Sequence, residues 1–162
     1  MRLSTKGRYA VMAMVDLAMH CDGKPVALAA IAERQDISLS YLEQLFARLK
    51  RNALVKSVRG PGGGYMLAHG VDGTRISDII LAVDEPIRAT RCDPQSPHGC
   101  TKTKMRCATH DLWSELSNQI HLFLNSVTLA DVVNRRILGS SGRFMTGDGL
   151  ASAIPAAASA AE

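Results

Sequence analysis

Residues 38–67, SLSYLEQLFARLKRNALVKSVRGPGGGYML, decide the fold of this chain. From residue 40 to 51 the apolar side chains recur at i, i+3, i+4 and i+7, which is the spacing of an amphipathic helix; they are Leu42, Leu45, Phe46 and Leu49. Two short apolar segments then flank the sequence GPGGG at residues 60–64. This pattern predicts a helix followed by two short strands around a tight turn.

The segments upstream complete the pattern of a DNA-binding motif. Residues 5–19 form an Ala-rich apolar run, which predicts a buried helix with Ser4 or Thr5 as its N-cap. Residues 27–34 predict a short second helix, and ISDIILAVDE predicts one more helix, after the hairpin, over about residues 76–85. The winged helix-turn-helix motif has this order of elements: a helix, a short helix, a turn, a further helix and a glycine-tipped hairpin. The predicted fold class is therefore mainly α with a small β-hairpin wing.

The second helix of such a motif presents its polar face to the major groove, where side chains read base edges. The candidate reading residues lie near its start: Ser40, Tyr41, Glu43 and Gln44. Basic residues further along are expected to meet phosphates: Arg48, Lys50 and Arg51. Ser38 belongs to the same candidate interface, although its expected role is the helix N-cap. For Glu43 a structural alternative stays open, because Ser40-x-x-Glu43 also has the spacing of a capping box.

Arg59 and Gly60 lie at the predicted tip of the wing. An arginine that reaches the adjacent minor groove gains from the negative potential there, above all where the groove narrows over A·T-rich DNA. The glycines permit positive φ and a close approach of the backbone to phosphates. The alternative is a plain tight hairpin, which GPGGG alone would also fit.

Charge and composition support a partner such as DNA and argue against a membrane. Residues 1–60 carry ten Lys or Arg against five Asp or Glu, a balance of +5, whereas the remainder carries nine against ten, a balance of −1. A basic N-terminal part suits a polyanion, and a solvated basic surface would have the same charge balance. No apolar stretch is long enough to span a bilayer, and the N-terminus lacks the features of a signal peptide. We therefore expect a cytoplasmic protein, with Cys21 as a small buried side chain.

Three cysteines and a histidine fall within nineteen residues, spaced Cys92-x7-Cys100-x6-Cys107-x2-His110. In a cytoplasmic protein such clustering indicates metal or redox chemistry rather than disulfides. Structural zinc sites use closely spaced ligand pairs, and only Cys107 and His110 are that close. The long intervals favour an iron–sulfur cluster, in which a histidine can replace a cysteine. His98 competes for the fourth position, and we prefer His110 for its spacing.

Residues beyond the cysteines form a long amphipathic segment. Its apolar stripe spans more than four helical turns and consists of Leu112, Trp113, Leu116, Ile120, Phe123, Leu124 and Val127. One small winged domain cannot cover such a stripe, so we expect the helix to pair with its copy in a homodimer. Thr128 and Asp131 have capping-box spacing and open a short last helix.

Four regions follow from these patterns. Residues 1–85 are the expected winged helix-turn-helix domain, 86–110 the cluster-binding loop, and 111–136 the dimerisation helix with the short terminal helix. Residues 137–162 consist mainly of Gly, Ser and Ala, which cannot bury enough apolar surface to fold, so we expect a disordered tail.

Several of these segments together resemble the IscR-like iron–sulfur cluster assembly regulators. The resemblance rests on MRLSTKGRYAV, ISLSYLEQLFARLK, LVKSVRGPGGGYML, AVDE and the three-cysteine loop that ends in CATHDLW, and it runs from Met1 to about Asn134. It implies a homodimeric winged-helix transcription factor with a [2Fe–2S] cluster on Cys92, Cys100, Cys107 and His110. The loop between the first and third cysteines is longer here than is usual in the family.

The resemblance also implies how such a protein acts. The loaded form represses the genes for cluster biogenesis, and at some promoters the protein activates. Assembly proteins that donate the cluster are expected partners. Glu43 matches a glutamate that excludes the cluster-free form from one type of DNA site.

Other functions remain to be weighed against this one. The alternatives are a nitric oxide or redox sensor with a similar cluster and a zinc-stabilised winged-helix regulator. An enzyme is disfavoured, since the sequence has no C-x-x-C pair and no nucleotide-binding glycine motif after a strand.

Overall fold

The computed structural model describes residues 4–87, 90, 100–101 and 105–137. Six helices and one hairpin lie in these residues: α1 Thr5–His20, α2 Leu28–Gln35, α3 Leu39–Arg51, β1 Val55–Val58, β2 Gly64–Leu67, α4 Ile76–Ala82, α5 His110–Ser126 and α6 Leu129–Val133. The predicted fold class is confirmed: the described residues are mostly helical, with one two-stranded antiparallel sheet.

Helix α1 is the centre of the winged domain. It packs against α2, α3, α4, α6 and β2, because its Ala-rich sequence lets neighbouring helices approach closely. The largest fully buried side chains are mainly apolar and come from α1, α2, α3, α4 and α6. The ring of Phe46 in α3 meets that of Tyr65 in β2 edge to face, at 4.9 Å between centroids, and so joins the hairpin to the core.

A buried ion pair holds α2 against α1. Asp16 is 2% exposed and accepts bonds from Arg34 Nη2 at 2.6 Å, from Arg34 Nε, and from Gln35 Nε2 at 2.8 Å. Burial by itself raises the pKa of Asp16, but the hydrogen bonds from Arg34 and Gln35 outweigh it and hold that pKa below its ordinary value. The pair therefore orients the first helix of the helix-turn-helix motif.

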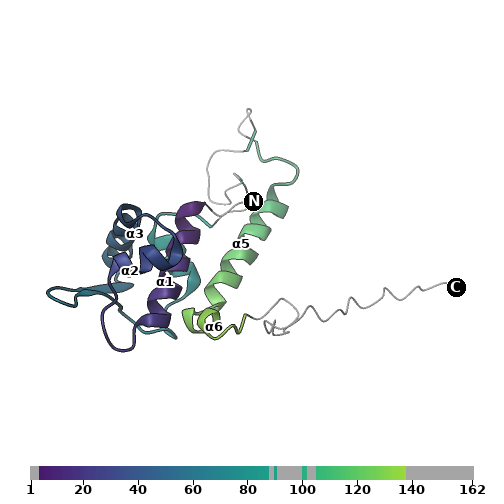
Figure 1. The fold of residues 1–162 in the computed structure, drawn as a ribbon. Helices are drawn as coiled ribbons and strands as arrows, with labels where there is room; N and C mark the ends of the chain where they lie inside the picture. Colours follow the sequence, from purple (N-terminus) through teal and green to yellow (C-terminus); the bar gives the residue numbers. More distant parts are fainter. Residues whose placement is uncertain (1–3, 88–89, 91–99, 102–104, 138–162) are drawn as a thin grey trace.

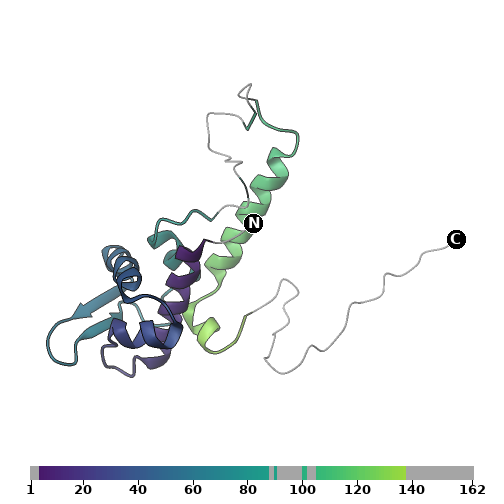
Figure 2. The same ribbon diagram turned by 45° about the horizontal axis from the view of Figure 1, so that its top comes forward.

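The hairpin projects from the winged domain on the side away from α5 (Figures 1 and 2). Its strands pair in register from Val55–Leu67 to Val58–Gly64. A further isolated bridge joins Val26 to Tyr65 and ties the loop before α2 to the same sheet. The wing is thereby anchored at its base and free at its tip.

Helix α5 leaves the body of the domain toward the loop that carries the cysteines (Figure 1). Its C-terminal end contacts α4, and Ile76 N donates to Val127 O at 3.0 Å. The capping box predicted for Thr128 and Asp131 is present, and the bond from Thr128 holds the pKa of Asp131 below its usual range. None of the helices in the described part of the chain has the length and apolarity needed to cross a membrane.

One predicted boundary was wrong. The helix expected over residues 76–85 ends at Ala82, because Val83 is its C-cap and Asp84 adopts a left-handed φ of 56°. Residues 137–162 were predicted to form a disordered tail, and all but the first of them lie outside the described residues.

Candidate nucleic-acid interface and candidate metal centre

Helix α3 begins at Leu39, and Ser38 is its N-cap. The Ser38 hydroxyl accepts a hydrogen bond from Tyr41 N at 3.3 Å, so the predicted capping role is confirmed. Ser40 lies inside the first turn and does not cap the helix. The capping-box alternative for Glu43 is therefore wrong, and the carboxylate of Glu43 takes no part in capping α3.

The outward face of α3 is mainly polar, although Leu39 at its start is also exposed. Ser40, Glu43, Gln44 and Arg51 are exposed. The opposite face, which carries Leu42, Leu45, Phe46 and Leu49, is buried as predicted from the spacing. Packing against the core thus presents Ser40, Glu43 and Gln44 to solvent in one row.

Two predicted contact residues also make contacts within the protein. Tyr41 is half-buried and its ring meets that of Tyr9 edge to face at 6.1 Å. Arg48 Nη1 donates to Asp84 Oδ2 at 2.5 Å and to Val83 O at 3.2 Å. Both side chains lie beside the exposed row and connect α3 to its neighbours.

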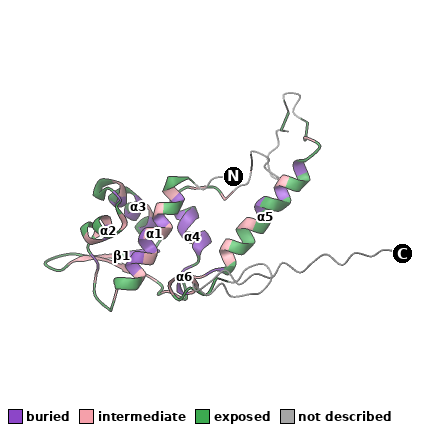
Figure 3. Ribbon diagram, turned by 45° about the vertical axis from the view of Figure 1, so that its right-hand side comes forward, coloured by how far each residue is buried: buried purple, intermediate pink, exposed green. Residues whose placement is uncertain are grey.

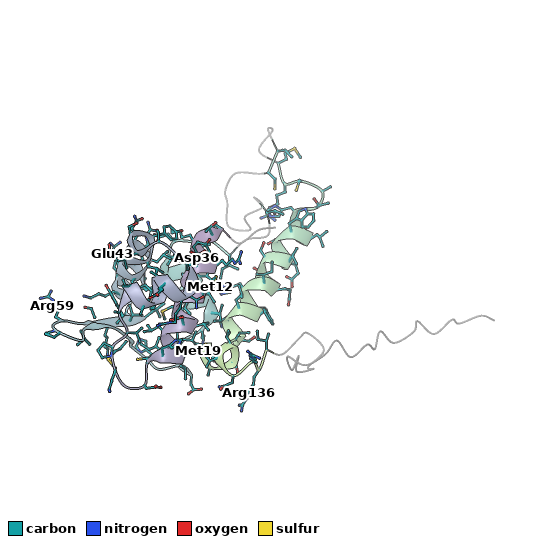
Figure 4. All side chains as sticks on the ribbon, in the orientation of Figure 1. Met12, Met19, Asp36, Glu43, Arg59 and Arg136 are labelled. Carbon is teal, nitrogen blue, oxygen red and sulfur yellow. The ribbon has the colours of Figure 1, made fainter. Side chains whose placement is uncertain are left out.

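Arg59 and Gly60 lie at the exposed tip of the hairpin, and Figure 4 shows the Arg59 side chain at the outer end of the wing. Gly60 adopts a φ of 102°, in the left-handed region that favours glycine. At Gly63 a Cβ atom would overlap the carbonyl oxygen of Val58. The glycines are therefore required by the turn itself, as the plain-hairpin alternative supposed, and the same turn carries Arg59 outward.

The structure brings three of the predicted metal ligands together. One donor atom each from Cys100, Cys107 and His110 lies within 4.8 Å of the other two. The Nδ1 atom of His110 is 2.9 Å from the sulfur of Cys100. His110 N donates to Cys107 O at 3.0 Å, which closes the short loop between them. Cys92 and the competing His98 lie outside the described residues.

The environment of His110 fits a metal-bound histidine. Its side chain is 5% exposed, and its Nε2 atom is buried without a hydrogen-bond partner among the described residues. Leaving a buried polar atom unpaired costs about 1–3 kcal/mol. Coordination of a metal by Nε2 would remove this cost, and two cysteine sulfurs with one imidazole suit iron or zinc. The residues present therefore fit a metal group.

His110 is also the first residue of α5. The N-cap position, Thr109, makes no side-chain capping bond; instead its hydroxyl accepts from Trp113 Nε1 at 3.0 Å. The start of the helix and the candidate metal site therefore share one residue.

Two links between these sites were missed by the sequence analysis. Glu85 accepts hydrogen bonds from the backbone and hydroxyl of Ser4 at 3.0 and 2.6 Å, and Asp84 binds Arg48. Both acidic residues directly precede the predicted cluster-binding loop. The partner of Glu85 is 81 residues away in sequence and that of Asp84 is 36 residues away, so no local sequence pattern predicts these pairs.

The apolar stripe predicted for α5 has two parts in the structure. Val127 and Leu124 pack on the protein's own core. Further toward the N-terminal end, Leu112 is 61% exposed and Leu116 is 40% exposed, and Phe123 is exposed as well. Leu122, which lies outside the predicted stripe, is also exposed. Figure 3 shows exposed segments along the length of α5.

Comparisons with known proteins agree with this arrangement. The family model Rrf2, described as iron-dependent transcriptional regulator, matches residues 3–135. The HTH-type transcriptional regulator IscR of Yersinia pseudotuberculosis is 56% identical over 136 residues, which are 84% of this chain and 81% of that protein.

Solved structures give the same result. T. potens IscR has a TM-score of 0.66 and 39% identity and covers 83% of this chain and 87% of its own. CymR, the global cysteine regulator of B. subtilis, has a TM-score of 0.68 and 33% identity, with coverage of 83% and 97%. These relatives are transcriptional regulators and not enzymes, and they do not favour the nitric oxide or zinc-only alternatives. The chain therefore belongs to the Rrf2 family of iron-dependent transcriptional regulators, and within it is a regulator of the IscR type.

Proposed function

We propose that this protein binds a [2Fe–2S] cluster on Cys92, Cys100, Cys107 and His110 and regulates genes for cluster biogenesis according to whether that cluster is present. The observation that carries the proposal is the convergence of Cys100, Cys107 and His110, with one buried and unpartnered imidazole nitrogen among the described residues. The cluster, when bound, supplies a labile centre whose occupancy reports the supply of clusters in the cell.

The chain's own residues explain why this centre is labile. Histidine is a neutral ligand, whereas cysteine binds as a negatively charged thiolate, so a site with His110 holds its metal less firmly than four cysteines would. Cys100 is exposed and Cys107 is half-buried, which leaves the thiol side of the site open to solvent. A centre of this kind suits a sensor better than a permanent structural site.

Hydrogen bonds at the root of the loop connect it to the DNA-binding helix. The loop leaves α4 through Asp84 and Glu85, which bind Arg48 of α3 and Ser4 at the start of α1. Ordering of the loop would act on these two residues first. Through them it would change how α3 is presented to DNA.

The exposed row on α3 supports binding to double-stranded DNA through the major groove. Gln44 can pair with adenine, and Glu43 can accept from the amino group of cytosine. At a DNA sequence that offers no such donor, the carboxylate of Glu43 is repelled by the negatively charged DNA phosphates. Glu43 can therefore weaken binding to such sequences. Ser40 and Tyr41 lie beside them, Arg51 suits a phosphate, and Arg59 with Gly60 reaches the minor groove.

A homodimer accounts for the exposed leucines and Phe123 of α5. Pairing of this helix with its copy would bury them and place two recognition helices about 34–36 Å apart, one turn of the duplex. We assign residues 111–136 to this role, 86–110 to the cluster-binding loop and 1–85 to DNA binding. We further propose that the loaded form represses some promoters and that the protein activates others. We place the protein in the cytoplasm, where assembly proteins donate the cluster.

An ultraviolet–visible spectrum with iron and sulfide analysis, on protein purified without oxygen, tests the cluster. A red-brown protein with about two irons and two sulfides per chain is the expected result. Colourless protein with stoichiometric zinc would contradict the cluster and leave the DNA-binding domain in place. Footprinting of loaded and empty protein then tests regulation, and identical footprints at every promoter would contradict it.

A further inference from the structure

A basic hollow of about 550 Å³ lies between the C-terminal half of α3 and the hairpin. Lys50, Lys56, Arg59 and His69 line it, together with Ser57, and no acidic residue lines it. The four basic or imidazole side chains come from three parts of the chain and are all exposed. Two of them, Lys56 and His69, play no part in the interface described above.

The hollow continues the recognition face of α3. Glu43, Ala47 and Lys50 follow one another at i, i+4 and i+7, so they share one stripe of the helix, and all three are exposed. At its other side the hollow reaches Arg59 at the wing (Figure 4). It therefore lies between the side chains that would enter the major groove and the one that would enter the minor groove.

The walls of the hollow are held in place by the fold. Lys50 Nζ donates to Ser57 Oγ at 2.6 Å, which links the end of α3 to β1. Strand β1 pairs only with β2 in the described sheet, and its residues Val55, Lys56 and Ser57 line the hollow. Packing and this one bond thus gather the positive charges before any ligand is present.

We propose that this hollow holds a phosphate of the DNA backbone at the boundary between the two grooves, and that Lys56 and His69 are its positioning residues. The inference rests on the proposed DNA-binding function and adds a site to it. A backbone that crosses from the groove of α3 to the groove of Arg59 must pass this point, where Lys50, Lys56 and Arg59 offer three cations. A phosphate held here would fix the register of Gln44 and Glu43 on the bases without itself reading sequence.

The test is the salt dependence of DNA binding by the full-length Lys56→Gln variant. The probes are a duplex selected from a random pool by the wild-type protein and a duplex of scrambled sequence. Loss of one phosphate contact lowers the slope of log K against log salt by about 0.9. At 0.15 M salt it weakens binding about five-fold on both duplexes, if the electrostatic contribution vanishes near 1 M.

Arg136→Gln is the matched control, since it removes the same charge from an exposed residue on the other side of the molecule (Figure 4). It should leave the slope unchanged, Lys56→Arg should restore it, and His69→Gln should lower affinity without changing sequence preference. If the slope were unchanged in Lys56→Gln while Gln44→Ala still weakened binding, the phosphate site in the hollow would be contradicted and the proposed DNA-binding function would stand. If the wild-type protein enriched no duplex from the random pool, the proposed function itself would fail.

A second arm distinguishes a DNA phosphate from a free anion. Inorganic phosphate is titrated into the protein at constant ionic strength, with and without the selected duplex. We expect it to compete with DNA no better than chloride does. Tight binding of inorganic phosphate that requires Lys56 in the absence of DNA would make the hollow a small-anion site and overturn the inference.

Discussion

Arg48 of α3 is bound to Asp84, the residue at which the chain turns out of α4 toward the cysteines, at 2.5 Å between Nη1 and Oδ2. The same nitrogen donates to Val83 O, and Asn52 Nδ2 donates to Ala82 O at 3.1 Å. The end of α3 is thus tied to the end of α4 at two points. We expect a movement of the loop root to be transmitted through these bonds to α3, the proposed recognition helix.

Asp84→Asn should uncouple the two sites while leaving the protein folded. The pair is on the surface, with Asp84 74% exposed in its side chain, so its loss should change the free energy of unfolding by less than about 1 kcal/mol. We expect the ratio between the DNA affinities of the loaded and the empty protein to fall toward one. Asp72→Asn, at an exposed residue after the hairpin, is the control and should keep the wild-type ratio.

Ser38→Ala and Ser40→Ala should separate capping from recognition. Loss of the Ser38 cap should lower the free energy of unfolding by about 1 kcal/mol, measured by denaturant titration. Ser40 makes no cap, so its replacement should change stability by only a few tenths of a kcal/mol and should act on DNA affinity instead. Equal loss of stability in both variants would contradict the assignment of Ser38 as the cap.

Protonation of Asp16 should lower the free energy of unfolding at acidic pH. The pKa of Asp16 is lower in the folded state than its ordinary value of about 3.9, so its contribution is complete above that value. It is lost as the pH falls through the lower folded pKa. Asp16→Asn should reduce stability at neutral pH by about 2 kcal/mol and flatten the acid side of the stability profile. An unchanged acid limb in this variant would assign the loss to other carboxylates.

Removal of iron should loosen the start of α5. Because His110 is both the first helical residue and a proposed ligand, a chelator should speed amide exchange in the first turns of α5 and leave α1 unchanged. Cys92→Ala and Cys100→Ala should abolish the cluster spectrum and mimic the chelated protein. Cys21→Ser should keep the spectrum, since Cys21 donates to Lys24 O in a different loop. An intact spectrum in Cys92→Ala would remove Cys92 from the ligands.

Leu116→Glu should produce a folded monomer. Leu116 is 40% exposed, so the charge does not disturb the core of one chain, but it would be buried in a helix pair. Sedimentation velocity should show half the wild-type mass with the same helical content. Asn118→Glu adds a charge to an exposed polar residue of the same helix and should remain dimeric.

Local patterns predicted most of the fold. The periodic leucines of α3, the GPGGG turn and the Thr128–Asp131 capping box each act within a few residues, and each has the predicted structure. The error at the end of α4 has a local cause, since an apolar pattern continues through Val83 although the backbone turns at Asp84.

The candidate sites were predictable only in part. Residue type and spacing indicated Cys100, Cys107 and His110, whose convergence the structure displays. The bonds of Arg48 to Asp84 and of Ser4 to Glu85 join residues far apart in sequence, and a surface arginine has the same sequence signature whether it meets a phosphate or a carboxylate. Only the packing of α4 against α1 and α3 determines these partners.

The cap at Ser38 has a consequence for how this helix can evolve. The residue that caps α3 lies outside the exposed row. The side chains that pack α3 on the core are Leu42, Leu45, Phe46 and Leu49. Ser40, Glu43 and Gln44 are then free of any part in holding the fold. Substitutions at these three positions carry little risk of unfolding, so a gene duplicate could acquire a new set of operators while its core and its metal site stay as they are.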